Sequence, residues 1–288
     1  MTWHLQRMAL FDIESTGVDP HRDRIVTAAL IGVGGGRTTS PQAWLLNPGI
    51  QIPQGAIDVH GITNEEAAKG MDASAGVEQI ARTMLAASQS GVPIVGHNVV
   101  YDLTLLHAEL VRHGHIGLAA DVAAIRPVID TQIIEKHLDP YRPKEPKAWT
   151  KRPVETCGSH TLVECCRLWG VELSAEDAHG AEADALAAGR LAWRLATQPD
   201  RFAQFDDPRR PLGRIRPAEM NLRELHEWQQ AEYRTSAASF QSYMRGEQRG
   251  KPDEVDPEFI ARTDWPVQPL PADWAPDQLP AAHEVVSA

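Results

Sequence analysis

Two acidic side chains, Asp12 and Glu14, lie in one short apolar stretch near the start of the chain, residues 8–14. If this stretch is a β-strand, the alternation of side chains places both carboxylates on the same face. Neighbouring carboxylates repel each other and are costly to remove from water. A bound cation is the usual way to keep such a pair ionised. The competing interpretation is an exposed strand end with solvated acids.

Two further acids and a histidine lie at the starts of predicted helices. Asp102 begins a helix predicted over residues 100–113. Asp184 lies on a helix predicted over residues 181–196, and its spacing from Ala188 and Leu191 puts it on the apolar stripe. His179 lies five residues before Asp184. Taken singly, each acid could complement a helix dipole, and the histidine could be an ordinary loop residue.

Four carboxylates and one histidine together indicate a hydrolytic metal site. Carboxylate oxygens are good ligands for Mg²⁺ and Mn²⁺, and four such groups can hold two ions roughly 4 Å apart. Ions held in this way lower the pKa of a bound water and stabilise a leaving oxygen. A histidine side chain can accept the proton of that water near neutral pH. The combination is typical of phosphodiester hydrolysis.

The order of apolar segments predicts an α/β domain that would position these residues. The first three strands are joined by short turns, which favours an antiparallel meander. Strands are expected at residues 8–14, 24–33, 42–46, 93–96 and 127–130, and helices at residues 77–87, 100–113, 131–137, 160–169 and 181–196, with a further short helix starting at residue 63. We therefore expect a mixed five-stranded sheet flanked by helices in one domain, residues 1–198.

The C-terminal third has a different composition. Residues 199–217 are proline-rich and are predicted to be a linker, and residues 218–250 form a helical extension with one long helix over residues 220–244. That helix could dimerise, bind a polymerase or another protein, or pack back on the domain. Residues 251–288 are acidic and proline-rich, which favours a disordered tail with Trp265 and Trp274 as possible anchors.

Bulk composition excludes some classes of function. The 288 residues contain 39 Asp and Glu against 28 Lys and Arg, a formal charge of −11, which argues against coating nucleic acid by bulk charge. An enzyme that grips a strand end locally remains compatible with this charge. The chain shows no secretory or membrane-spanning pattern, so we expect a reduced, cytoplasmic setting. Cys157, Cys165 and Cys166 are interpreted as structural thiols.

One locally basic segment stands out in this acidic chain. Residues 142–152 carry five Lys or Arg and one Glu. The segment could follow a phosphate backbone through its lysines and arginines. The alternative is a solvated surface loop.

Four sequence motifs resemble those of the DnaQ-like DEDDh 3′–5′ exonucleases, which include proofreading subunits and RNase T-type enzymes. The family pattern D-x-E-T/S-T-G is matched by residues 12–17, and G-H-N-x-x-F/Y-D by residues 96–102. The pattern H-x-A-x-x-D is matched by residues 179–184, and H-G-I-T by residues 60–63. The motifs occur in the family's order and cover about residues 7–198. The resemblance implies a ribonuclease H-like fold.

The resemblance also implies roles for individual residues. Asp12, Glu14, Asp102 and Asp184 correspond to ligands of two Mg²⁺ or Mn²⁺ ions, and His179 corresponds to the general base of the histidine branch. The residues expected around the terminal nucleotide are Thr16, Gly17, His60, Asn98 and Tyr101, of which Asn98 and Tyr101 would also support Asp102.

The expected function is removal of nucleoside 5′-monophosphates from the 3′ end of single-stranded nucleic acid, with DNA favoured. An exoribonuclease that trims RNA or short oligonucleotides is the first alternative, and a non-catalytic nucleic-acid-binding adaptor on the same fold is the second. The segment at residues 139–159 is longer and more basic than the family pattern, and no clamp-binding Q-x-x-L-F peptide is found. Pathway and oligomeric state therefore stay open.

Overall fold

A mixed β-sheet organises the fold. The computed structural model describes residues 2–140, 142–146, 152–173, 179–205, 213–248 and 254–276. Within these residues the sheet has six strands in the order β4-β3-β2-β1-β5-β6. They are β1 (Met8–Ser15), β2 (Ile25–Val33), β3 (Ser40–Asn47), β4 (Met71–Asp72), β5 (Ile94–Gly96) and β6 (Val128–Asp130).

The strand pairing confirms the predicted meander and corrects the predicted strand number. β1, β2 and β3 pair antiparallel, whereas β5 joins β1 and β6 joins β5 in parallel. The prediction of five strands was wrong because β4 also pairs, in parallel with the end of β3. Two residues are too few to show the alternation by which a strand is recognised in sequence.

Nine helices surround the sheet in the described part of the chain. They are α1 (Gln54–His60), α2 (Asn64–Ala67), α3 (Ala73–Gln89), α4 (Val99–Arg112), α5 (Ile116–Ala123), α6 (Thr131–Leu138), α7 (Leu162–Trp169), α8 (Ala181–Thr197) and α9 (Leu222–Met244), with short 3₁₀ turns at Trp3–Leu5, Val154–Thr156, Ala203–Phe205 and Pro217–Glu219. The predicted capping box of α2 forms between Thr63 and Glu66. α1 was not predicted, and it buries none of its residues, so it has no apolar stripe to recognise.

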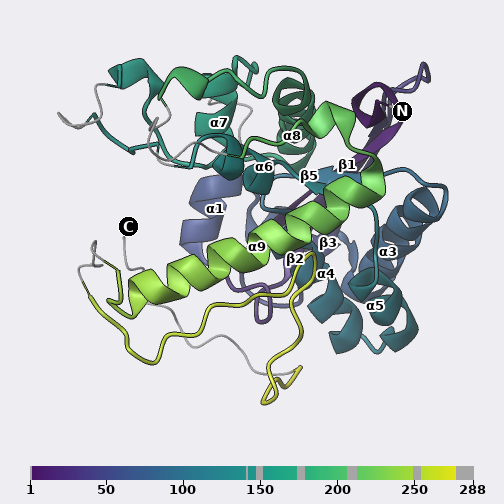
Figure 1. Cartoon of the computed structure of the whole chain (residues 1–288). Coiled ribbons are helices and arrows are strands. Elements are labelled where there is room, and N and C mark those ends of the chain that lie inside the picture. Colours follow the sequence, from purple (N-terminus) through teal and green to yellow (C-terminus); the bar gives the residue numbers. More distant parts are fainter. Residues whose placement is uncertain are drawn as a thin grey trace.

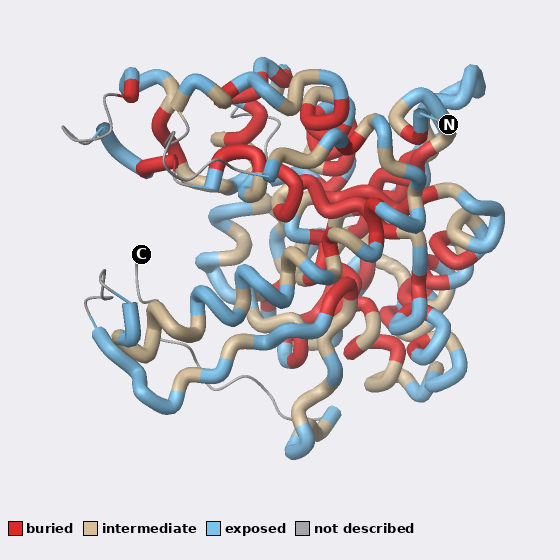
Figure 2. Tube along the Cα trace, in the orientation of Figure 1, coloured by how far each residue is buried: buried red, intermediate tan, exposed pale blue. Residues whose placement is uncertain are grey.

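Side chains of β1 alternate between two hydrophobic cores on opposite faces of the sheet. Figure 2 shows the buried residues, in red, gathered mainly in the middle of the molecule. Phe11 and Ile13 pack into the core formed with α3 and α4. Leu10 packs into the other core, which contains residues of α7, α8 and the start of α9. Asp12 and Glu14 have the same parity as Leu10, so they project on the α8 side of the sheet. β1 thereby turns both acids toward the helix that carries Asp184.

Helix α9 packs back on the domain, which is one of the alternatives left open by the sequence, and it contacts the outer strand β6. Figure 1 shows α9 crossing in front of the sheet. Its residues Leu225, His226 and Gln229 are buried. The Gln229 amide donates to the backbone oxygen of Val128 at 3.0 Å and accepts the N–H of Asp130 at 2.7 Å. Gln229 therefore takes the place of a neighbouring strand at the edge of the sheet.

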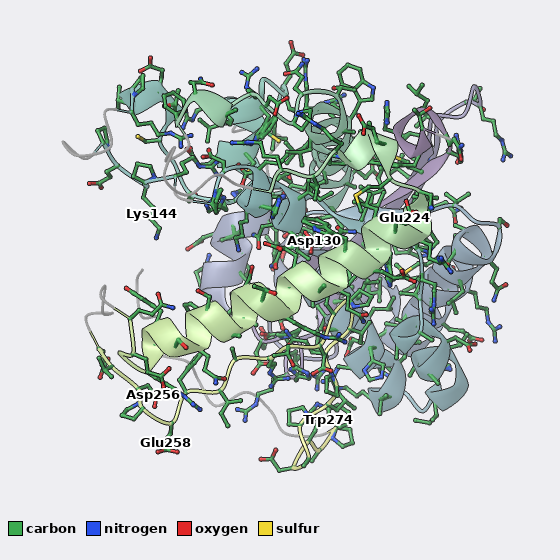
Figure 3. All side chains as sticks on the ribbon, in the orientation of Figure 1. Asp130, Lys144, Glu224, Asp256, Glu258 and Trp274 are labelled. Atoms are coloured by element: carbon green, nitrogen blue, oxygen red, sulfur yellow. The ribbon has the colours of Figure 1, made fainter. Side chains whose placement is uncertain are left out.

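Residues 254–276, within the segment whose composition predicts disorder, run back along α9 and then contact α4 and the loop that follows β1. Trp265 is 3% exposed and belongs to the core beneath α9. The Trp274 indole N–H donates to the backbone oxygen of His21 at 2.7 Å, and Figure 3 shows Trp274 at the far end of this segment. Both tryptophans named as anchors contact the domain. Residues 277–288 lie outside the described residues.

Two further sequence expectations concern the chain as a whole. Cys157, Cys165 and Cys166 are free and buried, as expected for structural thiols. Among the described helices, none combines the length and apolar character that a membrane span requires.

Candidate active site

Three carboxylates from two elements meet at one point. β1 supplies Asp12 and Glu14, and the first turns of α8 supply Asp184. One ligand oxygen from each lies within 4.8 Å of the other two. All three residues are partly exposed, so the group is reachable from solvent. Three of the four acids predicted as ligands therefore form one cluster.

Asp102, the fourth predicted ligand, is buried beside this cluster in the first turn of α4. Its Oδ1 accepts the backbone N–H of Ile13, between the two acids of β1, at 3.0 Å. The pairing of β1 with β5 ends at Leu10, so Asp102 bonds a backbone donor farther along β1. A Cβ at Gly96 would lie 2.9 Å from the Phe11 carbonyl oxygen, so only glycine lets β5 turn closely into α4.

His179 lies at the entrance to α8, beside Asp184. Its backbone is left-handed, with φ of 70°, and its side chain is exposed. A hydrogen bond from its backbone N–H and the charge of its ring both lower the pKa of Asp184, against the larger effect of burial. The predicted general base and the predicted ligand are therefore neighbours. The residues before it, 174–178, lie outside the described part of the chain.

Burial and mutual repulsion make this group of acids expensive to ionise. Burial is the main cause that raises the pKa of Glu14 to about 8, with Asp184 and Asp102 adding to it. Burial also raises the pKa of Asp102 to about 8, and the pKa values of Asp12 and Asp184 rise for the same reason. Without a counter-charge, several of these carboxyls hold a proton at neutral pH.

The donor set fits a hard divalent cation. It consists of carboxylate oxygens alone, which Mg²⁺ and Mn²⁺ prefer over softer ligands. The Oδ1 atom of Asp184 is buried and has no hydrogen-bond partner among the described residues. A buried carboxylate oxygen without a donor is costly unless a ligand completes it. A cation bound by Asp12, Glu14 and Asp184 would satisfy this atom and offset the repulsion.

Tyr101 and Gly17 meet in the loop that follows β1. The Tyr101 hydroxyl donates to the Gly17 carbonyl oxygen at 2.6 Å, and the Ser15 hydroxyl lies 2.7 Å from the same two oxygens. Burial raises the pKa of Tyr101 well above its usual value, so the hydroxyl remains a donor. A Cβ at Gly17 would lie 2.7 Å from the Asp23 carboxylate. Tyr101 thus supports the loop at Gly17 in addition to flanking Asp102.

Thr16 has a structural part in the same loop. Its side chain is 2% exposed, and its hydroxyl donates to Asp23 at 2.8 Å and accepts the N–H of Arg24 at 3.0 Å. Its backbone N–H donates to the Arg24 carbonyl at 3.0 Å. The structure therefore uses Thr16 to close the loop. Contact of its hydroxyl with a nucleotide, as the resemblance implies, would require these bonds to be given up.

His60 and Asn98 are the other two residues predicted to contact the terminal nucleotide. His60 Nδ1 accepts the N–H of Ile62 at 3.0 Å, which leaves the ring proton on Nε2. Nε2 is buried near the Ser15 backbone without a well-formed hydrogen bond among the described residues. Asn98 has a left-handed backbone at the start of α4, and its side chain is exposed. Both residues can face an incoming ligand.

The basic segment at residues 142–152 was considered as a phosphate-binding surface, but the arginines at its two ends form ion pairs within the protein. Arg142 is buried and pairs with Glu135 and Asp139, with a distance of 3.2 Å to the second. Arg152 pairs with Asp139 at 2.5 Å. The two arginines fasten the segment to α6 and are not available to phosphates. Lys144 is exposed and points away from the ribbon in Figure 3, whereas Lys147 and Lys151 lie outside the described residues.

Two buried acids were missed by the sequence reasoning. Asp130 ends β6 and accepts the backbone N–H groups of Asn98 and Gln132, both at 2.9 Å, so it fixes the turn that leads to Asp102. Figure 3 shows it beside α9, near the centre of the molecule. Glu135 lies on the buried face of α6. An acid at a third strand end, and an acid between the apolar residues of a helix, were the signals available in the sequence.

A sheet in which an antiparallel meander is followed by parallel strands, with acids on β1 and in the first turns of α4 and α8, defines a ribonuclease H-like fold with a DnaQ-like carboxylate site. The chain belongs to the exonuclease family. The model of that family matches residues 10–192, from the middle of β1 to the last turns of α8. Its motifs predicted this family.

Curated relatives and solved structures agree with this assignment. Over 186 residues the chain is 27% identical to a DNA polymerase III PolC-type protein of Lacticaseibacillus paracasei, covering 65% of this chain and 11% of that protein. The PolC-type protein of Pediococcus pentosaceus is 24% identical over 134 residues, 46% of this chain and 9% of that one. The chain therefore spans about a tenth of the relatives it matches.

Escherichia coli exonuclease I shares the fold. Its structure in complex with a dT13 oligonucleotide gives a TM-score of 0.53 at 24% identity, covering 69% of this chain and 43% of that one. A second structure of the same enzyme with single-stranded DNA gives a TM-score of 0.52 at 21% identity, and the match covers 69% of this chain and 42% of that one. The match covers less than half of exonuclease I.

Proposed function

We propose that the protein is a divalent-metal-dependent 3′–5′ exonuclease that releases nucleoside 5′-monophosphates from single-stranded DNA. The observation that carries the proposal is the cluster of Asp12, Glu14 and Asp184, with Asp102 bonded between the two acids of β1. The reaction adds water to the terminal phosphorus and breaks its bond to the 3′ oxygen of the preceding nucleotide. The products are a 5′-monophosphate and a strand with a new 3′ hydroxyl.

The four acids would hold Mg²⁺ or Mn²⁺, in the two-ion arrangement that the motifs suggest. Bound there, the metal would activate the attacking water and neutralise the charge that grows on the leaving oxygen. The acids of the chain would position the metal. Asp12 and Glu14 are fixed by the pairing of β1 with β2, and Asp102 is fixed by its bond to Ile13. Asp184 is carried on the first turns of α8, against β1.

His179 is assigned as the general base. Its exposed ring lies beside Asp184 on a short turn, so it can approach a water placed at the cluster and carry the proton to solvent. His60 and the Gly17 loop are assigned to the terminal nucleotide. The Nε2–H of His60 is a buried donor that lacks a good partner among the described residues, and a sugar or phosphate oxygen would complete it.

DNA is favoured over RNA as the substrate, and the PolC-type relatives suggest a replication or repair setting. Support for DNA comes from relatives named as DNA polymerases and from the dT13 complex of exonuclease I. The relatives named as DNA polymerases also make a polymerase partner part of the proposal. An exoribonuclease remains the alternative, since acceptance of the 2′-hydroxyl depends on the shape of the sugar pocket.

A gel assay on matched strands tests the proposal. DNA and RNA 12-mers of one sequence, labelled at the 5′ end, are incubated with the full chain and Mg²⁺ or Mn²⁺. We expect a ladder that shortens stepwise from the 3′ end, faster for DNA, and no ladder with EDTA. A 3′-phosphorylated strand serves as the blocked control. Intact strands in both metals, or release of the 5′ label as a single nucleotide, would contradict the proposal.

A further inference from the structure

A hollow beside the outer face of α8 carries a different kind of chemistry from the carboxylate site. It has a volume of about 370 Å³ and is lined by the turn at residues 170–172 together with Arg190, Trp193 and Arg194. Trp193 is 40% exposed, which is unusual for the largest apolar side chain in a protein that buries Trp3, Trp169 and Trp265. The hollow therefore presents an aromatic surface between two cations.

The arginines of this hollow are held in place but keep most of their donors. Arg190 donates to the Glu172 carbonyl at 3.3 Å, and Arg194 donates to the Gly170 carbonyl at 3.2 Å. No carboxylate of the described residues forms an ion pair with either guanidinium. Each guanidinium has five N–H donors, so several remain for a ligand. Arg194 also lies 5.5 Å from the centre of the Trp193 ring.

The charge of the hollow is opposite to that of the chain. A third arginine, Arg201, bonds the Leu168 carbonyl at 2.9 Å and lies close to Gly170, one of the lining residues. Among the described residues that line the hollow, Arg190 and Arg194 are the cations and Glu172 is the one acid. The whole chain has a formal charge of −11. An acidic ligand is thus repelled by the molecule in general and attracted at this place.

The hollow faces away from the carboxylate cluster. Asp184 and Trp193 are nine residues apart on one helix, about two and a half turns, so their side chains point to opposite sides of α8. A strand whose 3′ end lies at Asp184 would have to pass around the helix to reach Trp193. The two sites can therefore be occupied at the same time by different molecules.

We propose that this hollow is a docking site for an acidic peptide of a partner protein, one that carries an apolar or aromatic side chain next to its carboxylates. The apolar side chain packs on Trp193, and the carboxylates bond Arg190 and Arg194 in the paired geometry that guanidinium groups favour. Trp and Arg are the residues that most often dominate the energy of protein interfaces. The site would tether the enzyme while its catalytic face stays open.

Fluorescence anisotropy with a labelled peptide tests the proposal. The probe is Asp-Glu-Asp-Glu-Leu-Phe with a free carboxyl terminus, and the full chain is titrated in EDTA so that no strand or metal contributes. We expect saturable binding that weakens at least tenfold in Arg190→Ala/Arg194→Ala and in Trp193→Ala. Arg223→Ala, which removes an exposed arginine on α9, should bind as the wild type does. The neutral analogue Asn-Gln-Asn-Gln-Leu-Phe should bind at least tenfold more weakly.

The controls separate docking from folding and from substrate binding. Trp193→Ala changes an exposed side chain, so its melting temperature should match that of the wild type while its peptide affinity falls. No binding of the acidic probe up to about 1 mM, or equal affinity in wild type and both variants, would overturn the proposal. It would also be overturned if the same substitutions weakened binding of a dT8 strand more than binding of the peptide.

Discussion

At the scale of single residues, the cost of ionising the site comes from four carboxyl groups that are largely removed from water. Burial raises the pKa of each, and Glu14, Asp102 and Asp184 add to the cost of ionising Asp12. Such a group lowers the stability of the metal-free protein, and a divalent ion bound there would offset this cost. The residues proposed to bind the metal therefore lower the stability of the metal-free protein.

Replacing one acid separates these two effects. Asp12→Asn removes a charge from the cluster but keeps the shape of the side chain. We expect the melting temperature in EDTA to rise by several degrees, because repulsion is relieved, while the increase caused by Mg²⁺ is largely lost. Differential scanning fluorimetry with and without Mg²⁺ measures both. Asp121→Asn, an exposed acid of α5, should alter neither value, and a wild-type Mg²⁺ shift in Asp12→Asn would contradict the ligand assignment.

The pH dependence of stability has a predictable sign. In the unfolded chain a glutamate ionises near pH 4.3, whereas burial keeps Glu14 protonated to about pH 8 in the folded protein. Between these values unfolding releases protons, so stability falls as pH rises and then levels off above about pH 8. Melting temperatures in EDTA from pH 5 to 9, compared with Glu14→Gln, isolate this group. The difference between the two proteins should grow with pH up to about 8; a constant difference would refute it.

At the scale of elements, the site depends on segments that fasten the loops around it. Arg142 is enclosed by α6 and the start of α7, where it bonds Glu135, Asp139 and the carbonyl oxygens of Gly158 and Ser159. The carbonyl oxygen of the next residue, His160, accepts a hydrogen bond from Nε2 of His97 at 3.0 Å. His97 belongs to the second motif. The arginine thus connects the basic segment to the turn that carries Asp102.

Arg142 and Lys144 should respond to substitution in opposite ways. Arg142→Ala leaves the buried carboxylate of Glu135 without its cation, so we expect a loss of about 3–5 kcal/mol in the free energy of unfolding. Lys144→Ala should change stability by no more than about 0.5 kcal/mol, and it should lower the salt dependence of strand binding. Urea unfolding and anisotropy at several salt concentrations measure the two effects. A stable Arg142→Ala would show that the ion pairs do not fasten the segment.

At the scale of the whole molecule, the sequence predicted those strands and helices whose apolar residues repeat at a regular spacing. The alternation in β1 and β2 and the apolar stripes of α3, α4 and α8 predicted their positions closely. Of the four acids predicted as ligands, Asp12, Glu14 and Asp184 lie in one cluster. The two-residue strand β4 and the solvent-facing helix α1 have no such pattern. The partners of Gln229 and Trp265 are distant in the chain, so nothing in the local sequence could identify them.

The most direct test of the central claim compares rates in two site variants. On a 5′-labelled DNA strand with Mg²⁺, His179→Ala should lose about 10²–10⁴ in kcat yet keep the Mg²⁺-induced rise in melting temperature, because it removes a base and not a ligand. Asp184→Asn should lose both, while Asp121→Asn keeps both. Wild-type rates in either site variant would contradict the account, since the clustered acids and His179 would then not be the catalytic residues.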